Sequence, residues 1–227
     1  MKNFLFLLTI SFIATSVFAQ SPKFNDAMAK TIAEMDTLNT GDQMMAVANK
    51  FERIAMAEKN QWLPYYYSAL SRCSAVFVYN DVTKNDNILD VAEKHAKTAD
   101  SLQPKNSEIL VLRSMIMGGR IMVDPMTRGQ QLGMQSMMLI NEAMQIDPTN
   151  PRAYYIMGQS LFYTPPQFGG GKEAGCSMFT KSKQNFALFT PASAIHPNWG
   201  EVQVDMMLKL CTSGTPPVDP VSGGDKE

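Results

Sequence analysis

The residues of this chain best suited to chemistry are its histidines, cysteines and one glycine run beside a lysine. His95 and His196 are the two histidines, and neither has a second His or a Cys at metal-ligand spacing. No Ser or Cys nucleophile stands in a recognisable arrangement with a base and a third positioning group. We therefore expect structural roles for both histidines, and predict no catalytic residues, no metal site, no cofactor and no enzymatic activity.

The glycine run is Gly169-Gly170-Gly171-Lys172, just before a helix predicted to start near Glu173. Glycines before a helix N-terminus could offer backbone N–H groups to an anion, with Lys172 adding charge. However, a phosphate-binding loop needs a Ser or Thr after the lysine, and Glu173 stands there. We favour a tight loop between helices with Phe168 packed into the core, and keep an anion site as the alternative.

The three cysteines are Cys73, Cys176 and Cys211. An oxidising compartment would permit one disulfide, and Cys176 with Cys211 is the first choice because both lie in the C-terminal third. Three buried free thiols are the alternative, since Cys is among the most buried residue types.

The N-terminus has the pattern of an export signal. Lys2 is followed by an apolar run from Phe4 to Ile13 and a small-residue end, which predicts a signal peptide over 1–19. The apolar run is shorter than the ~20 residues of a membrane span. We expect a mature chain without a membrane span, in the periplasm or secreted, and a flexible Pro- and Gly-rich tail over 212–227.

Composition excludes one class of partner. The formal net charge of the whole chain is −1 and 45% of its residues are hydrophobic. A nearly neutral chain offers no electrostatic footprint for nucleic acid. Its hydrophobic content is that of a chain that can build a core.

A repeat organises the rest of the chain. A set of residues spaced +4, +3 and +5 occurs twice, forty-four residues apart, and each set ends in proline. The first three members share one helix face, and the proline ends the helix. The helices that follow repeat as well, with a small residue at the same place in each. The two matched series are Ala92, Ala96, Ala99, Pro104, Leu110, Ser114, Met117 and Ser136, Ile140, Ala143, Pro148, Tyr154, Gly158, Leu161.

These residues resemble the tetratricopeptide repeat family over residues 61 to about 186. The junction Asp147–Tyr154 is a close match to that family's repeat boundary. Residues 120–200 also resemble a group of exported tetratricopeptide-like proteins of Gram-negative bacteria. The resemblance implies an all-α, right-handed α-solenoid of three to four helix pairs: an N-terminal pair over 20–60, then a repeat domain over 61–211, whose C-terminal capping helix would span about 198–210.

The period of forty-four exceeds the family's 34 by about ten residues. Counting between equivalent positions places the extra residues in the turns inside each pair, around 76–87, 118–133 and 163–171. Stacked pairs would bring these turns to one rim. The candidate partner-binding residues of this rim are Arg120, Asp124, Arg128, Tyr163, Phe168, Gly169, Gly170, Gly171, Lys172 and Trp199.

Trp199 has a second possible role, closing the open end of the solenoid. The chain also contains 18 methionines. Met134 and Met138 lie one turn apart, which favours core packing. A copper(I) site and an adaptable groove remain alternatives.

Two functions follow. The leading hypothesis is a non-enzymatic periplasmic or secreted scaffold that binds a protein or peptide of the cell envelope. The alternative is a small-molecule-binding or substrate-delivery component of an envelope uptake system, which would need an enclosed pore or cavity.

Overall fold

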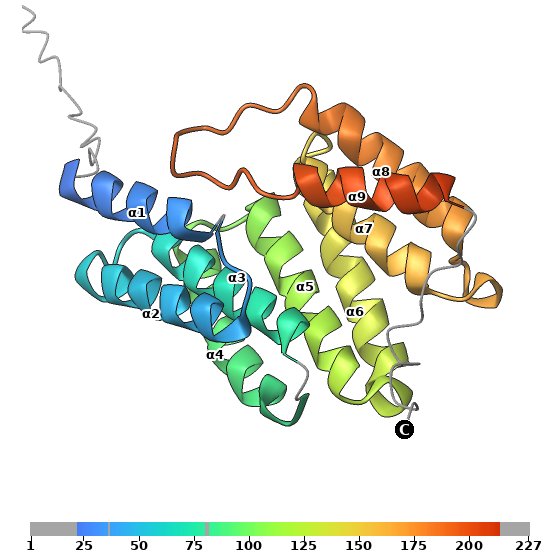
Figure 1. Cartoon of the computed structure of the whole chain (residues 1–227), viewed down its shortest axis with the longest axis horizontal. Coiled ribbons are helices and arrows are strands. Elements are labelled where there is room, and N and C mark those ends of the chain that lie inside the picture. Colours follow the sequence, from blue (N-terminus) through green and yellow to red (C-terminus); the bar gives the residue numbers. More distant parts are fainter. Residues whose placement is uncertain (1–21, 36, 80–81, 214–227) are drawn as a thin grey trace, which may run out of the picture.

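The computed structural model describes residues 22–35, 37–79 and 82–213, and these form helices joined by short turns and one long loop (Figure 1). No β-strand occurs in the described part of the chain, so the all-α prediction is confirmed. The predicted signal peptide and the tail from residue 214 lie outside the described residues.

The helices are α1 (Pro22–Met35), α2 (Gly41–Ala57), α3 (Trp62–Val78), α4 (Asn85–Leu102), α5 (Ser107–Val123), α6 (Pro125–Ile146), α7 (Pro151–Tyr163), α8 (Lys172–Phe186) and α9 (Glu201–Thr212), with short 3₁₀ turns η1 (Val82–Lys84) and η2 (Pro166–Phe168).

Polar side chains cap the N-termini of several of these helices. Thr40 and Gln43 form a capping box at the start of α2, satisfying backbone N–H groups in both directions. Asn106 and Asn150, one forty-four-residue period apart, cap α5 and α7 in the same way. Asp124 caps α6, whose first residue is a proline. The repeat is therefore visible in the caps as well as in the apolar residues.

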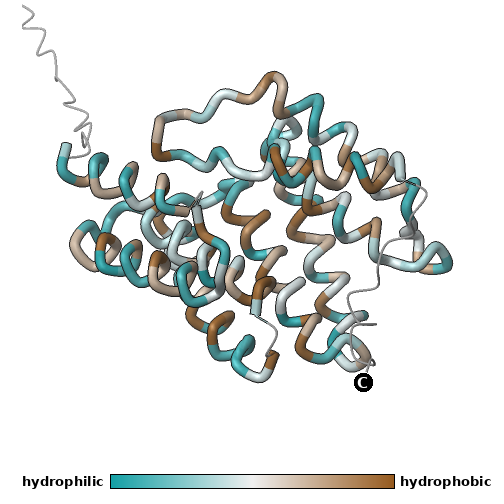
Figure 2. Tube along the Cα trace, viewed as in Figure 1, coloured by the Kyte–Doolittle hydropathy of each residue, from teal (hydrophilic) through white to brown (hydrophobic). Residues whose placement is uncertain are grey.

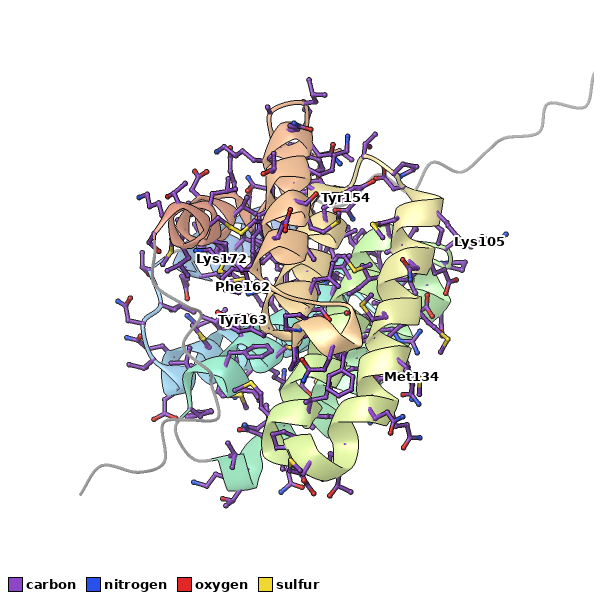
Figure 3. All side chains as sticks on the ribbon, turned by 90° about the vertical axis from the view of Figure 1, so that its right-hand side faces the viewer. Lys105, Met134, Tyr154, Phe162, Tyr163 and Lys172 are labelled. Atoms are coloured by element: carbon purple, nitrogen blue, oxygen red, sulfur yellow. A yellow bond between two sulfur atoms is a disulfide. The ribbon has the colours of Figure 1, made fainter. Side chains whose placement is uncertain are left out.

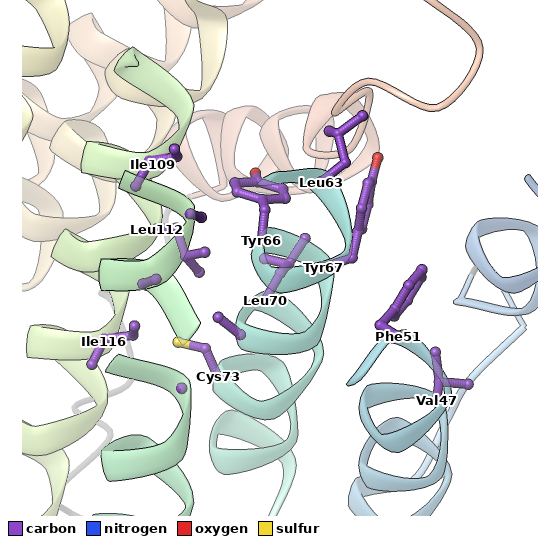
Figure 4. Packing of buried hydrophobic residues seen from close by; sticks show 14 of the residues in the cluster. Val47, Phe51, Leu63, Tyr66, Tyr67, Leu70, Cys73, Ile109, Leu112 and Ile116 are labelled. Atoms are coloured by element: carbon purple, nitrogen blue, oxygen red, sulfur yellow. The ribbon is translucent and has the colours of Figure 1, made fainter. Parts of the chain in front are cut away.

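Neighbouring helices pack side by side along the chain. Each helix lies chiefly on the ones before and after it, while α3 also touches α5 and α5 touches α7. Figure 4 shows apolar side chains of α3 lying between α2 and α5. Figure 2 shows long apolar stretches on α5, in the middle of the array.

The small residues of the repeat face their partner helices, as predicted. Ala92, Ala96 and Ala99 are completely buried on α4, and the corresponding set on α6 is buried too. The Ser114 and Ser136 hydroxyls lie 2.8 Å apart between α5 and α6. Small side chains on this face let the paired helices come close enough for such contacts.

The second predicted insertion is not a loop. Helices α5 and α6 extend through most of 118–133 and are separated by Asp124 alone. The extra residues of this unit therefore lengthen a helical hairpin, and Pro125 stands at the first helical position of α6, where proline is tolerated. The last helix also differs slightly from the prediction: it starts at Glu201 and includes Thr212.

A long segment, residues 187–200, connects α8 to α9 and is called the strap below. Figure 1 shows it as the orange loop that reaches from α8 back toward α1 and α3. It holds a buried Ile195 and the half-buried Trp199, whose indole N–H donates to the Tyr66 hydroxyl at 2.9 Å. The strap thus covers one end of the surface formed by α3, α5 and α7.

The structure joins Cys176 on α8 to Cys211 on α9 in a disulfide and leaves Cys73 as a buried free thiol. Burial raises the pKa of the Cys73 thiol to about 12, which keeps it protonated and unreactive.

Candidate functional site

The loop after α7, residues 164–171, is tightly built. The Gly171 N–H donates to the Leu161 carbonyl at 2.8 Å. A Cβ on Gly170 would stand 2.2 Å from the Thr164 carbonyl oxygen, so only glycine fits there. Gly169 and Gly171 have positive φ angles of 84° and 112°, which also favour glycine.

This loop is the tight turn that the sequence favours, but the predicted roles of Phe168 and Lys172 are not found. Phe168 does not plug the core: its side chain is 75% exposed at the apex of the loop. Lys172 is engaged within the fold, since its ammonium group donates to the Ser213 carbonyl at 2.6 Å. The glycines therefore shape a turn that holds Phe168 in solvent.

The charged candidates of the second turn are engaged within the fold. Arg128 donates to both carboxylate oxygens of Asp86 at 2.7 and 2.9 Å, and Arg120 donates to Asp90 at 2.7 Å. The Arg128 hydrogen bond lowers the pKa of Asp86 below its usual value. Asp124 accepts from the Thr127 N–H as a helix cap. These side chains tie the α5–α6 turn to α4.

Trp199 does not belong to the rim. It lies in the strap, and its carbonyl oxygen accepts from the fully buried Arg152 at 3.3 Å. The Arg152 guanidinium also donates to both Glu108 oxygens at 2.6 and 2.7 Å and stacks 4.4 Å from the centre of the Phe189 ring. Trp199 therefore has the closing role considered above.

Both histidines are held in structural contacts. His95 Nδ1 lies 3.0 Å from the Ser68 hydroxyl, and its Nε2 lies 3.7 Å from Glu52. Burial is the main cause that lowers the pKa of His95, with the nearby Arg72 second. His196, in the strap, lies edge-on to the Trp62 ring at the start of α3. Within the described residues, no three His, Cys, Asp or Glu side chains meet in a way that could hold a metal ion.

Open space lies beside three glycines where α5 and α6 approach their connecting turn. The register of this antiparallel pair is set by Ser107 donating to the Ala143 carbonyl and by the paired Ser114 and Ser136 hydroxyls. One turn beyond that serine pair, Gly118 on α5 comes opposite the segment of α6 that contains Gly133, with Gly129 one further turn along.

These glycines leave room that other residues do not fill. A Cβ on Gly129 or Gly133 would have no neighbouring atom within 4 Å, and one on Gly118 would meet only the tip of the Phe77 ring, at 4.0 Å. All three glycines are nevertheless half-buried. We call this space, floored by Gly118, Gly129 and Gly133, the glycine crevice.

The Phe77 ring lies beside this space, next to Gly118. Phe77, at the end of α3, is 45% exposed. On the other side, Ser160 of α7 donates to the Met137 sulfur at 3.7 Å, so the next turn of α7 brings Tyr163, 44% exposed, toward the level of Gly133. Figure 3 views this side of the molecule, with Tyr163 on α7 and Met134 on α6 labelled.

Met134 and Met138 are exposed on α6, so the prediction that they pack in the core is wrong. They lie on a different face of the helix from Gly129 and Gly133. A separate hollow of about 730 Å³ lies over the outer surface of α4. Its lining comes mostly from charged and polar residues of α4, and it is wide open to solvent, so it does not enclose a ligand.

Sequence reasoning placed Tyr163 and the second and third turns at the rim, but it missed the crevice. The signal was present: Gly118, Gly129 and Gly133 interrupt two helices where alanine would be more stable. Phe77 was missed because an aromatic at the end of a buried helix has no distinctive sequence pattern.

No family model matches the sequence, and no curated protein matches it either. The tetratricopeptide resemblance therefore stays a prediction, although the helical architecture is confirmed. Among solved structures, the fold matches the HusA haemophore from Porphyromonas gingivalis with a TM-score of 0.78. The two are 35% identical, over 89% of this chain and 99% of that one. Identity at that level over the whole length of HusA shows common descent, and this chain belongs to the same family as the HusA haemophore.

Proposed function

We propose that this protein is an exported, non-enzymatic carrier that binds a porphyrin such as haem for an envelope uptake system. The kinship with a haemophore supports the small-molecule alternative from the sequence better than the scaffold hypothesis. The observation that carries the proposal is the glycine crevice, where two packed helices leave unfilled space between aromatic borders.

A flat, apolar macrocycle suits such a place. Glycines present a smooth backbone surface with no side chains to displace, so a planar ring can lie close to the helices. Phe77 and Tyr163 can contribute offset or edge-to-face contacts with an aromatic ring system. In the proposed complex the apolar face of the ligand replaces water at the half-exposed rings, which is favourable in proportion to the area covered.

The histidines lie elsewhere, so the proposed binding does not depend on an imidazole–iron bond. His95 faces Ser68 and Glu52, and His196 lies in the strap against Trp62. We infer that ring stacking and burial supply most of the affinity.

The test is a haem titration followed by the change in visible absorption. Gly133→Leu should fill the crevice and weaken binding about tenfold or more, because a leucine there competes for the ligand's space. Gln145→Leu is the matched control, since it adds the same side chain to an exposed position of the same helix. Equal affinity for all three proteins would show that haem, if bound, lies elsewhere. An absence of binding by the unmodified protein would refute the proposed function.

A further inference from the structure

The helix α9 carries apolar side chains on two of its faces. Val204 and Met207 point inward and are buried in the core formed with α7 and α8. Val202, Met206 and Leu210 follow one another at four-residue intervals, so they form a line along a different face. Their exposed fractions are 69%, 59% and 41%. We call these three residues the α9 stripe.

An apolar stripe at this place in the fold has no role within a single chain. The helix is the last one in the described part of the chain, and it packs mainly on α8. The end helix of a stacked helical array normally turns a polar face to water. A helix that is apolar on opposite faces is typical of the interior of an assembly. We therefore expect a further surface to cover the stripe.

The stripe is carried on a rigid support. The disulfide between Cys176 and Cys211 joins α9 to α8. Lys183 of α8 also forms ion pairs with Glu201 at 3.0 Å and with Asp205 at 2.8 Å. A preorganised helix loses little conformational freedom when it associates, so more of its contact energy appears as affinity.

A row of charged residues runs beside the stripe and is complementary to a second copy of itself. Glu201, Asp205 and Lys209 also stand four residues apart, with the two acids in the first half of α9 and the lysine in the second. When two α9 helices pack antiparallel about a two-fold axis at Met206, the row of one helix faces the row of the other. Each Lys209 then lies midway along the helix axis between Glu201 and Asp205 of the second copy.

The same antiparallel pairing matches the apolar residues. Val202 lies opposite Leu210 of the second copy, and the two Met206 side chains meet at the axis. The two Asp205 carboxylates also approach each other there, but each is neutralised by Lys183 of its own chain. A parallel pairing has no such fit, because a two-fold axis along the helices puts the charged rows on opposite sides of the interface.

We propose that α9 is a dimerisation helix, which packs antiparallel on α9 of a second copy of this chain. The interface is isologous, since each copy contributes the same 12-residue helix. Two helices of this length bury less than the ~1,600 Å² of a standard interface, so the dimer is reversible, with an expected Kd of about 10–100 μM.

This proposal does not depend on the carrier function. Figure 1 shows α9 at the end of the α5–α6 pair opposite to the turn that joins them. The glycine crevice lies near that turn, so the crevice of each copy stays uncovered in the dimer. Haem affinity should therefore be the same in the variants described next as in the unmodified protein.

The first experiment is sedimentation velocity of the purified protein from about 1 to about 500 μM, a range that brackets the expected Kd. Met206→Glu should weaken self-association about tenfold or more, because it places two carboxylates together at the axis. Met56→Glu is the matched control, since Met56 is a similarly exposed methionine, at 63%, on α2. A monomer throughout this range would overturn the proposal, as would equal association of the two variants.

The second experiment exchanges charges between the two copies. Lys209→Glu alone and Glu201→Lys alone should each weaken self-association about threefold or more, because like charges then face each other. Mixed in equal amounts, the two variants should form a mixed dimer more tightly than either associates with itself. No gain on mixing would overturn the antiparallel pairing.

The chain's own tail is the competing occupant of the stripe. Apart from prolines, the large apolar side chains of residues 214–227 are Val218 and Val221, whereas a second α9 offers three at matching spacing. If the unmodified protein is monomeric and the double variant Val218→Ser, Val221→Ser dimerises, the tail is the occupant and the proposal is overturned.

Discussion

Gly158 and Gly133 allow a sharp comparison, because both are helical glycines but only one is enclosed. A Cβ on Gly158 would lie 2.6 Å from two carbons of the Phe179 ring and 3.2 Å from the Gly175 carbonyl oxygen. The ring is fully buried and the carbonyl belongs to a helix backbone, so neither can move away cheaply. A Cβ on Gly133 would touch nothing within 4 Å.

We therefore expect Gly158→Leu and Gly133→Leu to change stability in opposite directions. Overpacking at Gly158 should cost about 1–3 kcal/mol net, even after the gain in helix propensity. Gly133→Leu should stabilise the protein by about 0.5–1 kcal/mol, the propensity gain alone. In a chain of this size these changes correspond to roughly 2–12 °C lower and 1–4 °C higher Tm.

Thermal and urea unfolding followed by circular dichroism would measure both variants. If Gly158→Leu melts like the unmodified protein, the close approach of α7 and α8 at this residue is wrong. If Gly133→Leu is as destabilised as Gly158→Leu, the open space of the glycine crevice does not exist.

Three further predictions concern the groups that hold the fold together. Arg152→Met should lower the free energy of unfolding by about 3–5 kcal/mol, because Glu108 stays buried without its partner. Adding Glu108→Leu should recover most of that loss, as measured by urea unfolding. A double variant as unstable as the single one would contradict this. Replacing Cys176 and Cys211 by serine should cost about 2–4 kcal/mol, given their sequence separation of 35, and an unchanged Tm under non-reducing conditions would contradict it. Because the pKa of His95 is lowered in the folded protein, the unfolded chain binds more protons near pH 6, so stability should fall as pH falls from 7 to 5 by up to about 1.4 kcal/mol per pH unit. His95→Gln should flatten this dependence, and an equally steep slope in the variant would assign the effect to other groups.

The helical repeat could be predicted because it depends on contacts between near neighbours in sequence. Ala92, Ala96 and Ala99 had to share a face, and they are all buried against other helices. Pro148 had to end its helix, and α6 stops two residues before it. Such features follow from helix geometry and from the missing proline N–H, whatever the rest of the chain does.

The roles of individual side chains could not be predicted in the same way. Arg152 and Glu108 are one repeat apart, yet the sequence does not reveal that the strap would bury their ion pair. Phe168 is exposed although the sequence favoured a core position, whereas Trp199 has the closing role that the sequence favoured. The ion pair and the position of Trp199 depend on residues more than thirty positions apart that reach the same place.

The glycine run and the repeat show which features local sequence determines and which depend on tertiary packing. The sequence alone determined that the chain is helical, where most helices end, and that the loop around Gly170 must turn tightly, because these depend on local backbone sterics. Only the tertiary structure decided that Gly118, Gly129 and Gly133 surround empty space and that the loop displays Phe168 instead of burying it. Space between helices is set by how all the helices pack together, and no local pattern encodes it.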